Sequence, residues 1–328
     1  MSSFRNTSAL GSRSRPERSE TSVGIGQAIG AYGLWGALPL LFAAMAPAGP
    51  FEIVAWRIVF ALGFCIVVIG AGRTWPRIRA ILVRPDVLRT LGLAAFLIVI
   101  NWTVYVSATT SGRTVEAALG YFINPLVTIA LGVIVLRERL RPAQWVAVAL
   151  SAVAVIVIAV GYGQPPIIAL TLAFSFGLYG LVKKRVGAAV DALSGLTIET
   201  AWLVPFAVAA LVVFGVTGFD GGVTFGALGV WHALLLVLGG PVTAVPLLLF
   251  ASSARRLPLS LIGLCQYLTP VLQFIVGVWL QHEAMSPARW FGFAIVWLAL
   301  VVLTVDAFRA SRTSAGASRS AAAPAPVD

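Results

Sequence analysis

Two stretches of the chain decide the fold, because they share one unusual pattern: residues 119–145, LGYFINPLVTIALGVIVLRERLRPAQW, and residues 264–290, LCQYLTPVLQFIVGVWLQHEAMSPARW. Each contains an apolar segment long enough to cross a membrane, with a proline inside it. A proline within a helix removes one backbone hydrogen bond and clashes with the preceding turn. At an offset of 145 residues the stretches match at Pro125 and Pro270, Gly132 and Gly277, Glu138 and Glu283, Pro142 and Pro287, and Trp145 and Trp290. The repetition indicates two related halves.

The composition indicates an integral membrane protein. Of the 328 residues, 59% are hydrophobic and 11% are charged, whereas soluble proteins average about 25% charged residues. So few polar groups cannot cover the surface of a folded chain against water, and we expect an all-α membrane protein. The net charge of +11 does not indicate nucleic-acid binding, because the basic residues lie between apolar segments, where they orient membrane helices. Cys65 and Cys265 lie within apolar segments, so we expect no disulfide.

Ten segments have the roughly 20 apolar residues that a spanning helix needs. Their predicted ranges are 24–45, 50–71, 89–109, 114–136, 143–161, 165–182, 190–214, 229–252, 258–281 and 287–307. Lys and Arg concentrate in cytoplasmic loops, and cytoplasmic termini place every basic residue on that side except Arg57, Arg113 and Arg289. The sequence predicts a ten-helix protein of the bacterial inner membrane with disordered cytoplasmic tails at 1–22 and 309–328.

Two further matches support the internal repeat. GLWG at 33–36 matches GLYG at 177–180, and AWRIVF at 55–60 matches AWLVPF at 201–206. Together with the opening pair, the matches divide the chain into two five-helix halves, 23–161 and 162–308. Because five is odd, the second half enters the membrane in the opposite orientation. Inverted-topology repeats are common in secondary transporters, which bind substrate near the bilayer midplane between the halves.

Three prolines are candidate kinks or hinges: Pro125, Pro241 and Pro270. Interrupted helices at corresponding places in two halves indicate a binding site, although proline is also more frequent in membrane helices generally. Polar residues precede the repeated prolines and favour a cavity. They are Tyr121 and Asn124 in the first half, and Gln266, Tyr267 and Thr269 in the second.

Charged residues within spans are expensive and usually functional. Arg57 lies roughly 10 Å from the outer end of its span, at 1.5 Å per residue. It is expected to face the interior and either pair with Glu116 or bind a substrate carboxylate; the alternatives are a structural ion pair and snorkelling to the surface. Glu199, midway through the seventh span, either carries a coupling proton or makes a hydrogen bond to a neighbouring helix.

Aromatic and amide side chains complete the expected lining of a substrate cavity. Aromatic rings with polar tips suit amphipathic or aromatic solutes, while ordinary helix packing is the alternative for each residue. The predicted lining residues are Trp35, Arg57, Asn101, Trp102, Tyr121, Asn124, Gln266 and Tyr267.

Several segments resemble the RarD-type members of the EamA family, in the drug/metabolite transporter superfamily. They include EAALGYFINPL (116–126), IETAWLVP (198–205) and QYLTP (266–270), and the resemblance extends from about residue 24 to about 307. It implies a permease with a central cavity between inverted halves. RarD-like proteins carry the name "chloramphenicol-sensitive protein", and related members export amino acids and other small metabolites. Trp56 precedes Arg57 where the RarD pattern usually has His, which argues against a proton relay there.

Motif searches narrow the functional class. The chain has no P-loop for ATP, and it has no HExxH or GxSxG motif and no mid-membrane His. We therefore expect no catalytic residue, cofactor or metal site, and no nucleic-acid partner. The leading interpretation is a gradient-driven secondary transporter for an amino acid, metabolite or phenicol-like drug, working by alternating access among membrane lipids. A sensor or lipid scramblase of the same fold is the alternative. The sequence does not predict the coupling ion, the direction of transport or the oligomeric state.

Overall fold

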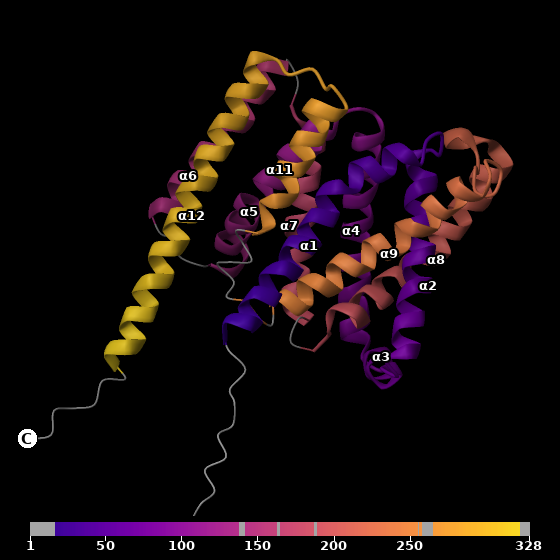
Figure 1. Ribbon diagram of the computed structural model, residues 1–328, viewed down its shortest axis with the longest axis horizontal. Helices are drawn as coiled ribbons and strands as arrows, with labels where there is room; N and C mark the ends of the chain where they lie inside the picture. The colour runs from indigo at the N-terminus through magenta and orange to yellow at the C-terminus, as the bar shows by residue number, and fades with distance from the viewer. Residues whose placement is uncertain are drawn as a thin grey trace, which may run out of the picture.

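The computed structural model describes residues 17–137, 142–162, 165–186, 189–254, 256–257 and 265–321. Within these ranges the regular structure is helical (Figure 1). The long helices are α1 (Glu17–Ala44), α2 (Pro50–Ala71), α4 (Pro85–Thr110), α5 (Thr114–Leu136), α6 (Pro142–Tyr162), α7 (Ile167–Val186), α8 (Ala192–Thr217), α9 (Val230–Ala254) and α12 (Pro287–Ala321). Shorter elements are α3 (Trp75–Leu82), η1 (Phe219–Gly221), α11 (Leu268–Ile275) and η2 (Val276–Leu280).

The all-α membrane class is confirmed. Nine of the described helices are long and apolar enough to cross a membrane, and α11 with η2 forms a shorter apolar helix, Leu268–Leu280. The ninth predicted span began at residue 258, and its first residues, 258–264, lie outside the described part of the chain. The structure is consistent with ten spans, and the count of ten stays a prediction.

The packing of the helices is nearly unchanged when the two predicted halves are exchanged. Helix α5 packs on α7, and its counterpart α11 packs on α1. Likewise α4 contacts α7 and α8, as its counterpart α9 contacts α1 and α2. The remaining two pairs, α2 with α8 and α6 with α12, each join corresponding spans, and α6 and α12 form one side of the bundle in Figure 1. This pattern is consistent with the predicted inverted repeat.

The repeated prolines occupy different local structures. Pro125 lies inside α5, which runs from Thr114 to Leu136, the range predicted from the sequence, without ending at the proline. Pro270 instead lies in the first turn of α11, after a turn at Tyr267, and there its missing N–H needs no helical partner. Pro241 lies within α9. The second-half helix is therefore interrupted, and the first-half helix is not.

Several helices extend beyond their predicted ends. Helix α1 begins at Glu17, inside the predicted tail, and α12 continues to Ala321, past the predicted end of its span. The extension of α12 is rich in alanine, the strongest helix former. Helix α7 continues to Val186 and so includes Lys183, which lies just beyond the predicted span 165–182. This last extension brings a charge into the bundle.

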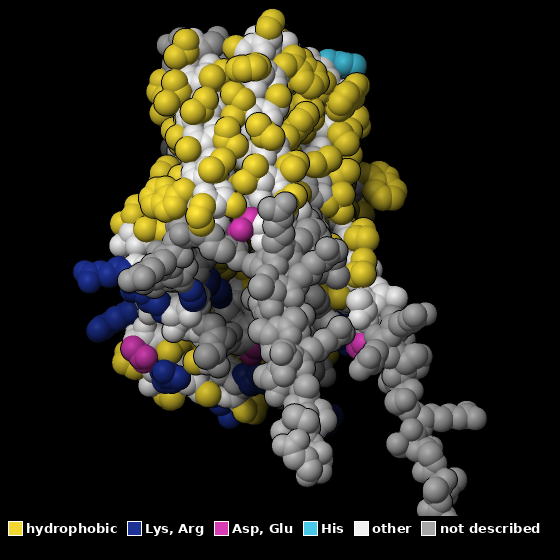
Figure 2. Space-filling model, turned by 90° about the vertical axis from the view of Figure 1, so that its left-hand side faces the viewer, with side chains coloured by type: hydrophobic (Ala, Val, Ile, Leu, Met, Phe, Trp, Pro, Cys, Tyr) yellow, Lys and Arg dark blue, Asp and Glu magenta, His cyan; other side chains and the backbone are white. Residues whose placement is uncertain are grey.

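The two ends of the bundle differ in charge. Figure 2 shows a broad hydrophobic surface above a lower region where Lys and Arg gather. The short helix α3, which the sequence analysis did not predict, lies at this lower end between α2 and α4 (Figure 1). We call this lower end of the bundle the Arg-rich end. Its exposed arginines on and beside α3 are Arg73, Arg77, Arg79, Arg84 and Arg89. The concentration of Arg at one end fits the predicted cytoplasmic side.

Candidate functional site

The candidate site is built around Arg57, on the eighth residue of α2. Its side chain is buried, with 4% of the residue exposed. Its Nε donates to Thr243 Oγ1 of α9 over 2.6 Å, and its Nη1 has no hydrogen-bond partner among the described residues. The expected ion pair with Glu116 is not present, because Glu116 pairs with Arg113 instead. A buried guanidinium thus keeps an unused donor.

Two aromatic rings pack against this guanidinium. The Cζ atom of Arg57 lies 4.6 Å from the Trp102 ring centroid and 5.6 Å from that of Phe42. The negative faces of aromatic rings attract cations, by about 2 kcal/mol where water is excluded. The rings therefore offset part of the cost of burying Arg57, but they supply no countercharge and no acceptor for Nη1.

The sequence GGPVT in α9 explains how Thr243 reaches Arg57. A side chain on Gly240 would lie 2.3 Å from the Phe60 backbone, so a glycine there lets α9 approach α2 closely. Gly239 faces Arg57 itself, and its carbonyl accepts the Thr243 hydroxyl proton over 2.7 Å. The hydroxyl oxygen of Thr243 therefore presents its lone pairs to the guanidinium.

A polar and aromatic network continues from Arg57 toward the other half. The Tyr105 ring packs edge-on against Phe42, with centroids 5.9 Å apart. Its hydroxyl accepts from Nε2 of Gln273, on α11, over 2.8 Å, while Oε1 of Gln273 has no partner among the described residues. We call Arg57, Thr243, Phe42, Trp102, Tyr105 and Gln273 the Arg57 cluster. It contains two incomplete polar groups, one donor and one acceptor.

Asn101 and Tyr121 form a hydrogen bond with each other beside this cluster. The Tyr121 hydroxyl donates to Oδ1 of Asn101 over 3.0 Å. Nδ2 of Asn101 donates across to α7, to the Leu172 carbonyl and to Ser175 Oγ, each at 3.1 Å. Asn101 is thus a bridge between α4, α5 and α7. Its hydrogen bonds to neighbouring helices are those of helix packing, the alternative to cavity lining for each predicted lining residue.

Glu199 is buried but fully paired. Its carboxylate accepts from Lys183 Nζ at 2.5 Å and from the Tyr179 hydroxyl at 3.0 Å, both on α7. Glu199 is 1% exposed in its side chain and Lys183 is 26% exposed. The ion pair therefore joins α7 and α8 near the Arg-rich end. The sequence did not predict the Lys183 contact, because Lys183 lies beyond the predicted span 165–182. Its spacing of four residues from Tyr179 nevertheless puts both on one helical face.

At the end opposite the Arg-rich end, two carboxylates of the second half accept hydrogen bonds from the first half. Glu283, in the loop before α12, accepts the backbone N–H of Val115 at the start of α5 over 2.8 Å and pairs with Arg289 at 3.2 Å. Asp220 likewise accepts the N–H groups of Phe51 and Glu52 at the start of α2, at 2.8 and 3.3 Å. Anionic groups stabilise helix N-termini, so both loops join the two halves at this end of the bundle.

Burial changes the protonation of Glu283. Desolvation raises its pKa from 4.5 to about 7, and the neighbouring Glu116 carboxylate adds to the rise. The Val115 N–H and the Arg113 guanidinium act in the opposite direction, and the Arg289 guanidinium beside Oε1 also favours the charged form. This loop contact therefore titrates near neutral pH.

The other predicted lining residues are divided between the cluster and its surroundings. The Trp35 carbonyl accepts from Gln273 at 3.4 Å, so Trp35 borders the cluster. Asn124 is buried with Oδ1 unpartnered among the described residues. Tyr267 packs against a separate hydrophobic cluster around Phe274 and Phe293, and Gln266 is half-buried on the same turn. The structure thus brings Arg57, Trp102 and Trp35 together and leaves Gln266, Tyr267, Glu116 and Glu199 apart.

The arrangement suits binding rather than catalysis. An incomplete guanidinium, an incomplete amide oxygen and several aromatic rings can recognise a small solute carrying an acidic group. Groups of three or more His, Cys, Asp or Glu side chains that could hold a metal are absent from the described residues. Four residues of the Arg57 cluster were not among the predicted site residues: Thr243, Phe42, Tyr105 and Gln273. Of these, Gln273 carried a usable signal, as a polar residue within an apolar span.

Comparisons with known proteins agree on one family. The model of the EamA-like transporter family matches residues 22–160. Protein RarD of Streptomyces exfoliatus is 50% identical over 295 residues, which cover 90% of this chain and 92% of that protein. Uncharacterized transporter YojE of Bacillus subtilis is 38% identical over 305 residues, covering 91% and 99%. A solved crystal structure aligns with a TM-score of 0.57 over 89% of this chain and 98% of its own, at 21% identity, a likeness of fold.

These likenesses define a membrane transporter with the EamA fold. The chain belongs to the EamA-like transporter family, and within it to the RarD-type permeases.

Proposed function

We propose that the chain is a secondary transporter that moves a small acidic solute across the bacterial inner membrane by alternating access. The observation that carries this proposal is Arg57, a buried guanidinium with an unused donor and no carboxylate partner among the described residues. Removing a charge from water costs several kcal/mol. A substrate carboxylate at Nη1 would offset that cost.

The rings around Arg57 point to the rest of the solute. Trp102, Phe42 and Tyr105 offer apolar faces beside the guanidinium, and Gln273 Oε1 offers an acceptor for an amino or hydroxyl group. An aromatic or amphipathic metabolite with one acidic group fits this set. The name "chloramphenicol-sensitive protein", carried by RarD-like proteins, makes phenicols the neutral compounds to compare.

Transport would require the closed cluster to open. Arg57 and Trp102 are 4% and 8% exposed, so a solute reaches them only if helices separate. The loop contacts of Glu283 and Asp220 hold one end closed, and their release would open that end. The termini would lie in the cytoplasm with the Arg-rich end, and the energy would come from an ion gradient or from the gradient of the solute.

Thermal unfolding against matched pairs of ligands tests the proposal. A ligand that binds only the folded state raises the melting temperature in proportion to the logarithm of its concentration over Kd. We expect phenylalanine and benzoate to stabilise the purified protein, and phenylalaninamide, benzamide and chloramphenicol to do so at least tenfold more weakly. Counterflow of a stabilising acid in proteoliposomes then measures transport.

Two variants separate binding at Arg57 from general effects. Arg57→Met removes the charge and should abolish the difference between acids and amides. Thr243→Val keeps the charge, removes the hydroxyl that bonds to Nε and to the Gly239 carbonyl, and should retain that difference. Equal stabilisation by acids and amides in the unchanged protein would contradict the proposal. Accelerated lipid exchange between leaflets without solute counterflow would favour a scramblase instead.

A further inference from the structure

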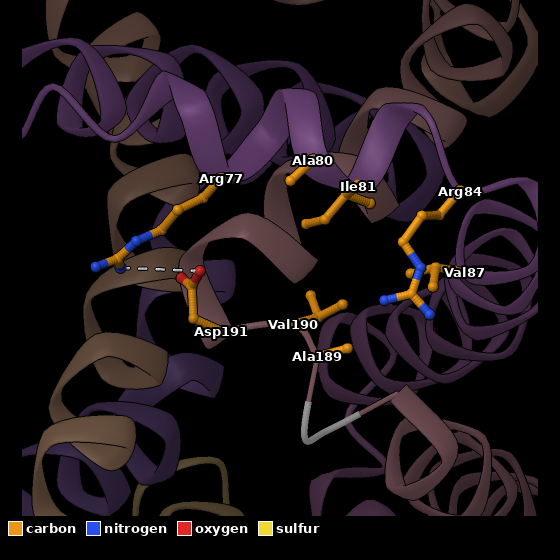
Figure 3. A pocket seen from close by; sticks show the side chains of 8 residues that line it. All are labelled: Arg77, Ala80, Ile81, Arg84, Val87, Ala189, Val190 and Asp191. Carbon is orange, nitrogen blue, oxygen red and sulfur yellow. Dashed lines mark ion pairs between the residues drawn. The ribbon is translucent and has the colours of Figure 1, made fainter.

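The Arg-rich end contains a pocket between α3, the start of α4 and the segment that precedes α8. Its volume is about 470 Å³, within the range of small-molecule sites. Arg77 and Arg84 stand at opposite ends of the pocket in Figure 3. The apolar side chains of Ile81 and Val190 lie between them, and Val87 lies beside Arg84. Two cations thus flank an apolar floor.

Neither arginine is held firmly by a carboxylate. Arg77 Nη1 lies 4.0 Å from Asp191 Oδ2, and Arg84 Nη2 lies 3.4 Å from Asp86 Oδ2. The side chains of these pairs are 38% to 70% exposed, and such pairs contribute little to stability. Asp191 is already used at the start of α8, where it accepts from the backbone N–H and the hydroxyl of Ser194. Both guanidiniums can therefore turn toward a ligand at low cost.

The position of α3 selects the kind of ligand. Its inner face is anchored, since Ile78 and Ile81 are buried in a cluster with residues of α2, α4 and α8. Its outer side exposes Trp75, and Leu82 and Val83 follow at 53% and 78% exposure. A short helix with a Trp, apolar side chains and arginines at the end of the spans is typical of the bilayer interface. The pocket therefore lies at headgroup depth.

We propose that this pocket binds the headgroup of an anionic phospholipid of the leaflet that faces the Arg-rich end. Arg77 and Arg84 donate to the phosphate oxygens, for which the guanidinium fork is well shaped. The exposed apolar residues beside α3 contact the acyl chains. Asp191 at the rim disfavours multiply charged phosphate esters and favours a phosphodiester with a single negative charge. Basic pockets between spans on the cytoplasmic side are typical lipid sites.

Native mass spectrometry of the full chain tests this assignment. The protein is purified in a neutral detergent, and phosphatidylglycerol or phosphatidylcholine is added in equal amounts. We expect one phosphatidylglycerol to be retained at least tenfold more tightly than phosphatidylcholine. The double variant Arg77→Gln, Arg84→Gln should lose this preference. The control Arg79→Gln, Arg89→Gln removes the same charge from residues that do not line the pocket, and it should change retention by less than twofold.

A variant that keeps every charge tests whether the pocket itself, and not only the local positive charge, retains the lipid. Ala80 lines the pocket and is exposed, so Ala80→Phe should fill the pocket and also weaken retention about tenfold. Equal losses in both double variants, or unchanged retention in Ala80→Phe, would overturn the pocket. Displacement of phosphatidylglycerol by millimolar inorganic phosphate would assign the site to a soluble phosphate compound rather than to a lipid.

Discussion

Two buried charges, Arg57 in α2 and Glu199 in α8, lie in spans that correspond in the two halves and pack against one another. Both carboxylate oxygens of Glu199 have partners within the protein, Lys183 and Tyr179. Arg57 has one hydrogen bond and two aromatic neighbours, and its Nη1 is left open. A buried charge that the fold completes serves packing, whereas one that the fold leaves incomplete is available to a ligand. The contrast predicts different roles for residues that looked alike in the sequence.

The largest expected effect is on transport by Arg57 variants. Arg57→Met should lower counterflow of an acidic solute at least about 30-fold, because a charged hydrogen bond in a dry site is worth about 2–5 kcal/mol. The melting temperature should stay level or rise, since removing an unpaired buried charge relieves its desolvation cost. Arg57→Lys keeps the charge but loses the fork, and should recover part of the transport.

This prediction would fail in a recognisable way. If Arg57→Met lowered the melting temperature by several degrees and reduced transport of acids and amides alike, Arg57 would be a structural residue. Arg57 and Glu199 would then both be structural residues, and the proposed difference between them would be wrong.

The second effect is on stability at Glu199. Glu199→Gln leaves Lys183 without a countercharge. We expect a loss of about 2 kcal/mol, below the roughly 3–5 kcal/mol of a fully buried pair, because Lys183 is 26% exposed. The double variant Glu199→Gln, Lys183→Met should recover most of it. Thermal unfolding of the three proteins measures the changes, while solute affinity should stay within twofold.

Transport at several pH values tests the other role considered for Glu199. If Glu199→Gln folded normally but no longer responded to a proton gradient, the carboxylate would carry the coupling proton. Glu199 would then be functional as well. The presence of hydrogen-bond and ion-pair partners within the protein would no longer distinguish a structural charge from a functional one.

Glu283 provides an intermediate case with a pH dependence. Its pKa of about 7 in the folded chain is above its ordinary 4.5, so the folded state binds a proton more tightly than the unfolded state. This contribution to stability is fully present below pH 4.5 and is lost as the pH rises through about 7. We expect a loss of about 2 kcal/mol between pH 5 and pH 8, seen as a falling melting temperature. Glu283→Gln should flatten the profile, and the exposed Glu20→Gln should not.

A profile that rose with pH would mean that Arg289 holds Glu283 ionised. The carboxylate would then resemble Glu199, completed by its ion pair, and the loop contact would not respond to pH.

The limits of prediction from sequence follow from the range of the interactions. Helix α5 could be predicted to the residue, because hydropathy and span length are local properties. The hydrogen bond from Arg57 to Thr243 joins residues 186 positions apart, and no pattern in either helix indicates the other. The burial of Lys183 depended on where α7 ends, and helix ends are poorly set by composition. The sequence could thus predict which charged residues are buried, but it could not predict which of them have hydrogen-bond and ion-pair partners within the protein.

The smallest expected effect concerns the repeated prolines, which differ as the two charges do. Pro125 lies within α5 and leaves the Tyr121 carbonyl without its helical donor, whereas Pro270 lies in the first turn of α11. Pro125→Ala restores that hydrogen bond and stiffens α5, so counterflow should slow about threefold. Pro270→Ala should change it by less than 1.5-fold on the same grounds. If the double variant Pro125→Ala, Pro270→Ala transports at the original rate and in the original direction, neither proline is a hinge, and helix α5 moves as a rigid unit.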